Sequence, residues 1–106
     1  MFVIVLLLRA RLGEVDALIA LHKDWQRHLR SKYSGYISGE LLKITHNSGE
    51  FISIMRFESR EDARVCVNSP VYQYWYRRVT SHSESIPELS GHCLERRSQK
   101  RLVLLR

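Results

Sequence analysis

Residues 51–58, Phe-Ile-Ser-Ile-Met-Arg-Phe-Glu, alternate regularly in side-chain character, and this stretch decides the fold. Successive side chains of a β-strand point to opposite sides, so the alternation predicts a strand with two distinct faces. One face holds Phe51, Ser53, Met55 and Phe57, and the other holds Ile52, Ile54, Arg56 and Glu58. Residues 36–45 form a second apolar stretch, separated from the first by the turn-forming residues 46–49. Together they predict an antiparallel hairpin.

The residues after the hairpin predict a helix that is interrupted once. Ser59-Arg-Glu-Asp62 has the form of a capping box, which starts a helix. Ser69-Pro70 interrupts it, but Ser is a good N-cap and Pro is favoured at the first helical position, so a second segment restarts at once. The predicted buried stripe of that segment is Val71, Tyr72, Trp75, Tyr76 and Val79.

Three further elements flank this central part. Residues 2–8, Phe-Val-Ile-Val-Leu-Leu-Leu, predict a buried strand. From Glu14 to Tyr33 the apolar residues recur at steps of three and four, which predicts an amphipathic helix. Residues 88–97 predict a fourth strand, and 102–105 are either a short fifth strand or part of a tail.

The predicted order β-α-β-β-α-β is that of an α+β, ferredoxin-like fold: a four-stranded antiparallel sheet with the helices on one face. Residues 2–8 show almost no polar alternation, so their strand is apolar on both sides. A chain of this size has no element left to cover the second face. We therefore expect two copies to pack sheet to sheet as a homodimer.

Composition narrows the class of protein. The chain has 106 residues, and 44% of them are hydrophobic, as in a single globular domain. Its net charge is +6, but residues 1–95 hold 12 Lys and Arg against 11 Asp and Glu. The excess lies in the last residues, a pattern that argues against a nucleic-acid-binding face.

Residues 2–8 are too short to span a bilayer, and no basic residue precedes them as in a signal peptide. We expect a cytoplasmic protein with no membrane partner. The two cysteines, Cys66 and Cys93, lack CxxC spacing and are expected to be reduced.

Four stretches resemble the antibiotic biosynthesis monooxygenase domain: residues 34–42, 51–57, 58–63 and 68–78, the last reading Asn-Ser-Pro-Val-Tyr-Gln-Tyr-Trp-Tyr-Arg-Arg. The resemblance assigns residues 1–97 to that domain and leaves 98–106 as a basic C-terminal tail or extra strand. It implies a dimeric α/β barrel built from ferredoxin-like protomers.

The resemblance also implies a class of activity. Members include monooxygenases that use no cofactor and act on phenolic, quinol or anthrone-like aromatics. In such enzymes a base removes a proton, and the electron-rich anion of the substrate reacts with oxygen. Other members degrade haem with an Asn, a Trp and an axial His, but the matching positions here hold Leu7 or Leu8, Cys66 and Tyr76. These departures argue against haem degradation.

Five residues are candidates for the site. His22 could be the catalytic base, because imidazole exchanges protons near neutrality, or a core histidine with one satisfied nitrogen. Four aromatic residues could form a wall that binds a flat small molecule, or could simply be core. They are Trp25, Tyr72, Trp75 and Tyr76. No metal-ligand spacing is found, so no metal is expected, and the resemblance implies that no cofactor is used.

Two other functions stay open at this point. One is a non-catalytic module that binds a small molecule or a partner on the same scaffold, because a fold hosts many functions. The other takes the basic tail as an anchor for an acidic partner. Arg56 and Glu58 share a strand face and could bind an anionic substrate or form a surface ion pair.

Overall fold

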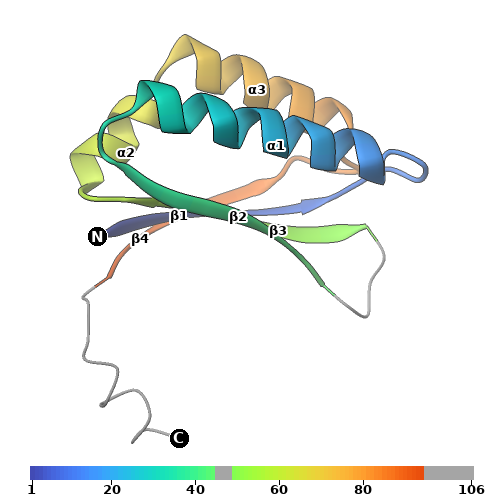
Figure 1. Ribbon diagram of the computed structural model, residues 1–106. Helices are drawn as coiled ribbons and strands as arrows, with labels where there is room; N and C mark the ends of the chain where they lie inside the picture. The colour runs from blue at the N-terminus through green and yellow to red at the C-terminus, as the bar shows by residue number, and fades with distance from the viewer. Residues whose placement is uncertain (45–48, 95–106) are drawn as a thin grey trace, which may run out of the picture.

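The computed structural model describes residues 1–44 and 49–94 (Figure 1). Seven elements follow one another in the order that the sequence predicts, with the second helical region divided in two. They are β1 (Phe2–Arg9), α1 (Val15–Lys32), β2 (Tyr36–Lys43), β3 (Glu50–Phe57), α2 (Arg60–Val67), α3 (Pro70–Ser81) and β4 (Glu88–Cys93). The strands end earlier than predicted at Lys43 and Cys93, and the tail at 98–106 lies outside the described residues.

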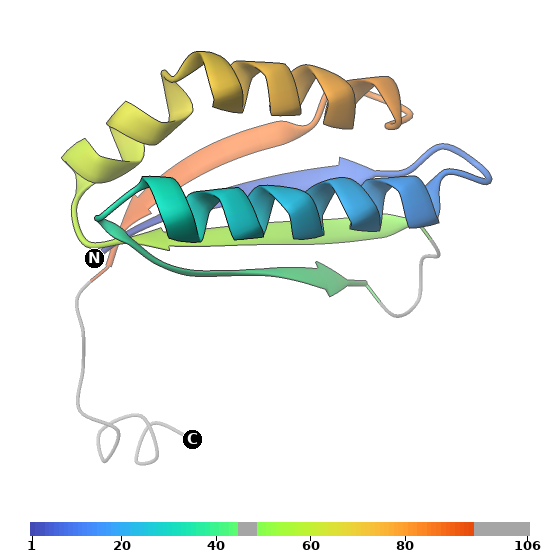
Figure 2. The ribbon, with the colours of Figure 1, turned by 45° about the horizontal axis from the view of Figure 1, so that its top comes forward.

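The four strands form one antiparallel sheet in the order β2-β3-β1-β4. The predicted hairpin pairs β2 with β3, and the strongly apolar β1 lies between β3 and β4. Figure 2 shows α1 over the β2–β3 side of the sheet and α3 over the β4 side. This arrangement confirms the ferredoxin-like α+β fold.

The core lies between the helices and one face of the sheet. The predicted face of β3 is the buried one, with Met55 and Phe57 completely inaccessible. Residues that pair directly across antiparallel strands share a face, and Leu6 of β1 lies opposite Ser53. The helices add Leu18, Trp25, Leu29, Trp75 and Val79 to the same cluster.

Serine caps start both α2 and α3, as predicted. Ser59 Oγ accepts a hydrogen bond from the backbone N–H of Asp62, and Ser69 Oγ accepts one from Tyr72. Ser69 makes two more contacts: its hydroxyl donates to the Cys66 carbonyl at 2.7 Å, and the Tyr33 hydroxyl donates to it at 2.9 Å. Ser69 therefore joins α2, α3 and the end of α1.

The second face of the sheet carries apolar residues with no covering element among the described residues. Val5 lies opposite Ile54, and Leu7 lies opposite Ile52, so these four side chains share that face. Leu7 keeps 43% of its surface exposed. Figure 1 shows all three helices on the other side of the sheet.

We expect Ser69→Ala to lower the free energy of unfolding by about 1 kcal/mol, because the N-cap bond is lost. Chemical denaturation with a constant m-value would measure the change. Ser31→Ala is the matched control, since that serine bonds only the His28 carbonyl on an exposed face of α1. Equal midpoints for the two variants would contradict the assigned role of Ser69.

Candidate functional site

A pocket lies between α1 and the sheet, at the β2 edge. Its volume is about 660 Å³, within the usual range for small-molecule sites. Its described lining residues are Ile19, His22, Lys23, Gln26, Arg27, Arg30, Glu40, Leu41, Lys43 and Phe51. All of them come from α1, β2 and β3, so α3 contributes none of the described lining.

Apolar side chains and one glycine shape the interior of the pocket. Ile19, Leu41 and Phe51 give it hydrophobic walls. Gly39 faces α1 from β2, and a Cβ atom there would overlap the Gln26 side chain and the Tyr36 hydroxyl. The missing side chain lets these two polar groups meet under the helix.

His22 is the one sequence-predicted site residue that lines this pocket. Its position on the apolar stripe of α1 leaves it only 4% exposed. Nε2 is hydrogen bonded to Ser53 Oγ at 2.8 Å, and Ser53 is fully buried. Burial lowers the pKa of His22 to about 4, because a charged imidazolium loses hydration there. The ring is therefore neutral at physiological pH.

Gln26 lines the pocket and forms a second polar pair with Tyr36 of β2. The Tyr36 hydroxyl donates a hydrogen bond to Gln26 Oε1. Burial raises the pKa of Tyr36, which keeps this donor protonated. Gln26 Nε2 is buried and has no hydrogen-bond partner in the described part of the chain. The amide therefore retains unused donor capacity.

Basic side chains surround the mouth. Lys23, Arg27 and Arg30 follow one another at steps of four and three, which places them on one face of α1. Lys43 adds a fourth basic group from the end of β2.

Glu40 is the only acid among the described lining residues, and it bonds Arg56 at 2.6 Å. Arg56 also donates to Ser38 Oγ at 3.3 Å. The ion pair proposed from the sequence thus forms with Glu40 rather than with Glu58, because Glu40 lies across the hairpin on the same face.

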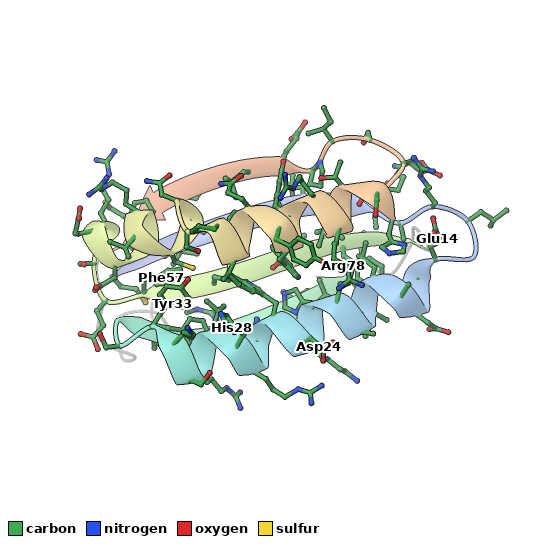
Figure 3. All side chains as sticks on the ribbon, turned by 90° about the horizontal axis from the view of Figure 1, so that it is seen from above. Glu14, Asp24, His28, Tyr33, Phe57 and Arg78 are labelled. Carbon is green, nitrogen blue, oxygen red and sulfur yellow. The ribbon has the colours of Figure 1, made fainter. Side chains whose placement is uncertain are left out.

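The four predicted aromatic residues form one cluster with His22. Trp25 stacks on Trp75, with ring centroids 5.2 Å apart, and His22 meets the Trp75 ring edge-on at 6.3 Å. Tyr72 packs against both tryptophans and stacks on Tyr76. Figure 3 shows α1 and α3 side by side over the sheet, and this cluster fills the interior between them.

Hydrogen bonds fix three of these aromatic side chains. Trp25 Nε1 donates to Met55 Sδ, Trp75 Nε1 donates to the Leu21 carbonyl, and the Tyr76 hydroxyl donates to the Pro87 carbonyl. The Tyr72 hydroxyl is buried and has no partner among the described residues. Burial also raises the pKa of Tyr72.

Trp25 and Trp75 also reach a second, smaller groove of about 160 Å³ on the outer side of the α1–α3 seam. Asp24 and Arg78, labelled in Figure 3, flank it. The role of the four aromatic residues in substrate binding stays a prediction. The larger pocket lies on the β2 side of α1 and not beside these four residues, whose rings pack on the α3 side.

Sequence reasoning did not select Gln26, Tyr36 or the basic residues of the mouth. The spacing of Lys23, Arg27 and Arg30 places them on one helix face, but nothing local indicates that β2 lies beneath that face.

Among residues 1–44 and 49–94, no three His, Cys, Asp or Glu side chains gather closely enough to hold a metal ion. No helix in those ranges has the length and apolar character needed to cross a bilayer.

The pKa of His22 predicts a specific pH dependence of stability. Between its usual pKa of 6.5 and about 4, the unfolded chain binds a proton that the folded chain does not. Stability should therefore fall as the pH drops through this window, by roughly 3 kcal/mol in total. His22→Gln removes the titrating group, so the variant should lose less stability over the same window.

Denaturation midpoints at pH 7, 5.5 and 4.5 would measure this difference. His92→Gln is the control, since His92 is exposed on β4 and bonds only Ser90. Parallel losses in the wild type and in His22→Gln would show that His22 does not resist protonation.

Several solved structures share this fold at low sequence identity. SnoaB, a cofactor-independent oxygenase from Streptomyces nogalater, has a TM-score of 0.78 at 10% identity, covering 92% of this chain and 96% of its own. Rv0793 from Mycobacterium tuberculosis has a TM-score of 0.79 at 18% identity, covering 92% and 98%. A Deinococcus radiodurans protein, whose name places it among antibiotic biosynthesis monooxygenases, has a TM-score of 0.83 at 10% identity, covering 93% and 97%. These likenesses establish the fold alone.

The sequence itself carries the family assignment. No curated protein sequence matches the chain significantly. The sequence pattern of the family described as antibiotic biosynthesis monooxygenase matches residues 1–78, well over half of the chain. The match extends from β1 into α3 and contains every described residue of the large pocket. The chain therefore belongs to the antibiotic biosynthesis monooxygenase family.

Proposed function

We propose that this protein is a cofactor-independent monooxygenase for an electron-rich aromatic small molecule such as a quinol, phenol or anthrone. One observation carries the proposal: a buried, neutral His22 borders a pocket with apolar walls and a basic mouth. The name of SnoaB as a cofactor-independent oxygenase supports the same reaction class. A flat aromatic body suits the walls made by Ile19, Leu41 and Phe51.

The first step is removal of a proton from the substrate. A ring nitrogen of the neutral His22 accepts a proton from a phenol or an acidic C–H group. An imidazole with a low pKa is a weak base, so the product anion needs stabilisation. The basic residues at the mouth supply part of it, and the anion in turn stabilises the imidazolium beside it.

The substrate anion then supplies the electrons for oxygen. For an anthrone, one oxygen atom becomes the new carbonyl of the product. The other oxygen atom leaves as water with the two hydrogens of the oxidised carbon, so no external reductant is needed. In this proposal the wall behind His22 is formed by Trp25, Tyr72, Trp75 and Tyr76. Of these, Trp75 makes an edge contact with the His22 ring.

An oxygen electrode tests this function. Protein treated with a chelator should consume oxygen with at least one member of a panel of quinols and anthrones. His22→Gln should lower kcat by about 100-fold, the usual contribution of a general base. Arg77→Gln, at an exposed position of α3 away from the pocket, should retain full activity. No turnover across the panel, or equal turnover by His22→Gln, would refute the proposal.

We also propose that the protein acts as a cytoplasmic homodimer whose protomers pack through the open face of the sheet. That face presents Val5, Leu7, Ile52 and Ile54 with no described element over them. Contiguous apolar surface of this kind is uncommon on monomeric proteins. A second copy of the same face would bury it symmetrically.

Sedimentation tests the dimer. The wild type should sediment as a dimer at micromolar concentration, and Leu7→Lys should sediment as a monomer, since a charge would be buried at the interface. Leu12→Lys is the control, because Leu12 is fully exposed in the loop after β1. A monomeric wild type, or a dimeric Leu7→Lys variant, would contradict the proposed interface.

A further inference from the structure

We propose that the α1–β2 pocket selects substrates that carry a negative charge, namely aromatic carboxylates or organic acids of similar shape. The inference rests on the proposed function only in taking this pocket as the substrate site. It concerns which aromatic compounds bind there, and it follows from the charge and the hydrogen-bonding capacity of the lining.

The described lining is strongly biased toward positive charge. Four basic side chains reach the pocket: Lys23, Arg27, Arg30 and Lys43. Glu40 is already paired with Arg56, so it offsets little of this charge. Asp24 bonds Arg27 at 2.8 Å, but both side chains are more than 70% exposed, and pairs of this kind exchange readily for another anion.

The neutral polar groups of the lining also favour an anionic ligand. The Gln26 carbonyl already accepts a bond from Tyr36, which leaves the buried amide as a donor without a described partner. His22 Nε2 is engaged by Ser53. An acceptor on the ligand is therefore what Gln26 lacks, and an anionic oxygen is the strongest acceptor available.

The arrangement of the two kinds of lining limits the ligand further. The apolar residues Ile19, Leu41 and Phe51 come from both sides of the pocket, whereas three of the four cations lie along one face of α1. A ligand that matches both the apolar walls and the cations has a flat hydrophobic body and an acidic group on the edge nearest α1. A neutral hydrocarbon would leave the cations and the Gln26 amide without partners.

A matched pair of probes isolates the charge. The compounds 2-naphthoate and 2-naphthamide have nearly the same shape, but only the first is an anion at neutral pH. We expect the wild type to bind 2-naphthoate roughly tenfold more tightly at low ionic strength, by isothermal titration calorimetry. Because the cations are exposed, added salt should reduce this preference.

The double variant Arg27→Gln/Arg30→Gln should bind the two probes with similar affinity. Arg64→Gln is the matched control, since Arg64 forms the same kind of exposed pair, with Glu61 on α2, away from the pocket. The control should keep the preference of the wild type. Equal binding by the wild type, an unchanged preference in the double variant, or no binding of either probe would each overturn the inference.

These outcomes are separable from a failure of the proposed function. The oxygenase proposal alone would be refuted by a preference for 2-naphthoate that depends on Arg27 and Arg30, together with no oxygen uptake for any quinol or anthrone. Oxygen uptake that depends on His22, without any preference of the wild type for 2-naphthoate over 2-naphthamide, would refute the charge selection alone.

Discussion

The hydrogen bond between His22 and Ser53 fixes how α1 lies on the sheet. Ser53 is at the centre of β3, opposite Leu6, in an otherwise apolar interior. Leaving either polar group unpaired there would cost about 1–3 kcal/mol, so the two partners are held together. Their contact sets the rotation of α1 about its axis. Trp25 then meets Trp75 on the α3 side, while Gln26 and the basic residues face β2.

The packing on the two sides of α1 consequently differs. On the α3 side, large aromatic rings pack against one another in the interior. On the β2 side, a pocket remains between the helix and the sheet, and Gly39 leaves room for the Gln26 and Tyr36 side chains to meet. His22 belongs to both sides, since it touches Trp75 and also borders the pocket. A titratable group is thereby held by packing beside a ligand-sized space.

Local patterns predicted much of the fold, but only part of the site. The alternation at 51–57, the serine caps and Pro70 are governed by neighbouring residues, and the elements formed as predicted. The sequence makes His22 a candidate because a titratable residue stands on an apolar stripe, and its catalytic role stays a prediction. Helical spacing correctly predicts that Tyr72 and Trp75 are buried, but it is wrong for Val71, which is exposed. Spacing also cannot distinguish a core ring from a pocket wall. The role of Gln26 depends on Gly39 and Tyr36, brought near only by the register of β2 beneath α1.

The proposed oxygenation and the proposed charge selection both require that the space between α1 and β2 binds the ligand. A crystal structure of the protein soaked with an aromatic ligand such as 2-naphthoate tests it directly. We expect the ring between Leu41 and Phe51, with its carboxylate near Gln26 and the basic face of α1. Ligand bound instead in the α1–α3 groove beside Arg78, with the α1–β2 pocket empty, would contradict it.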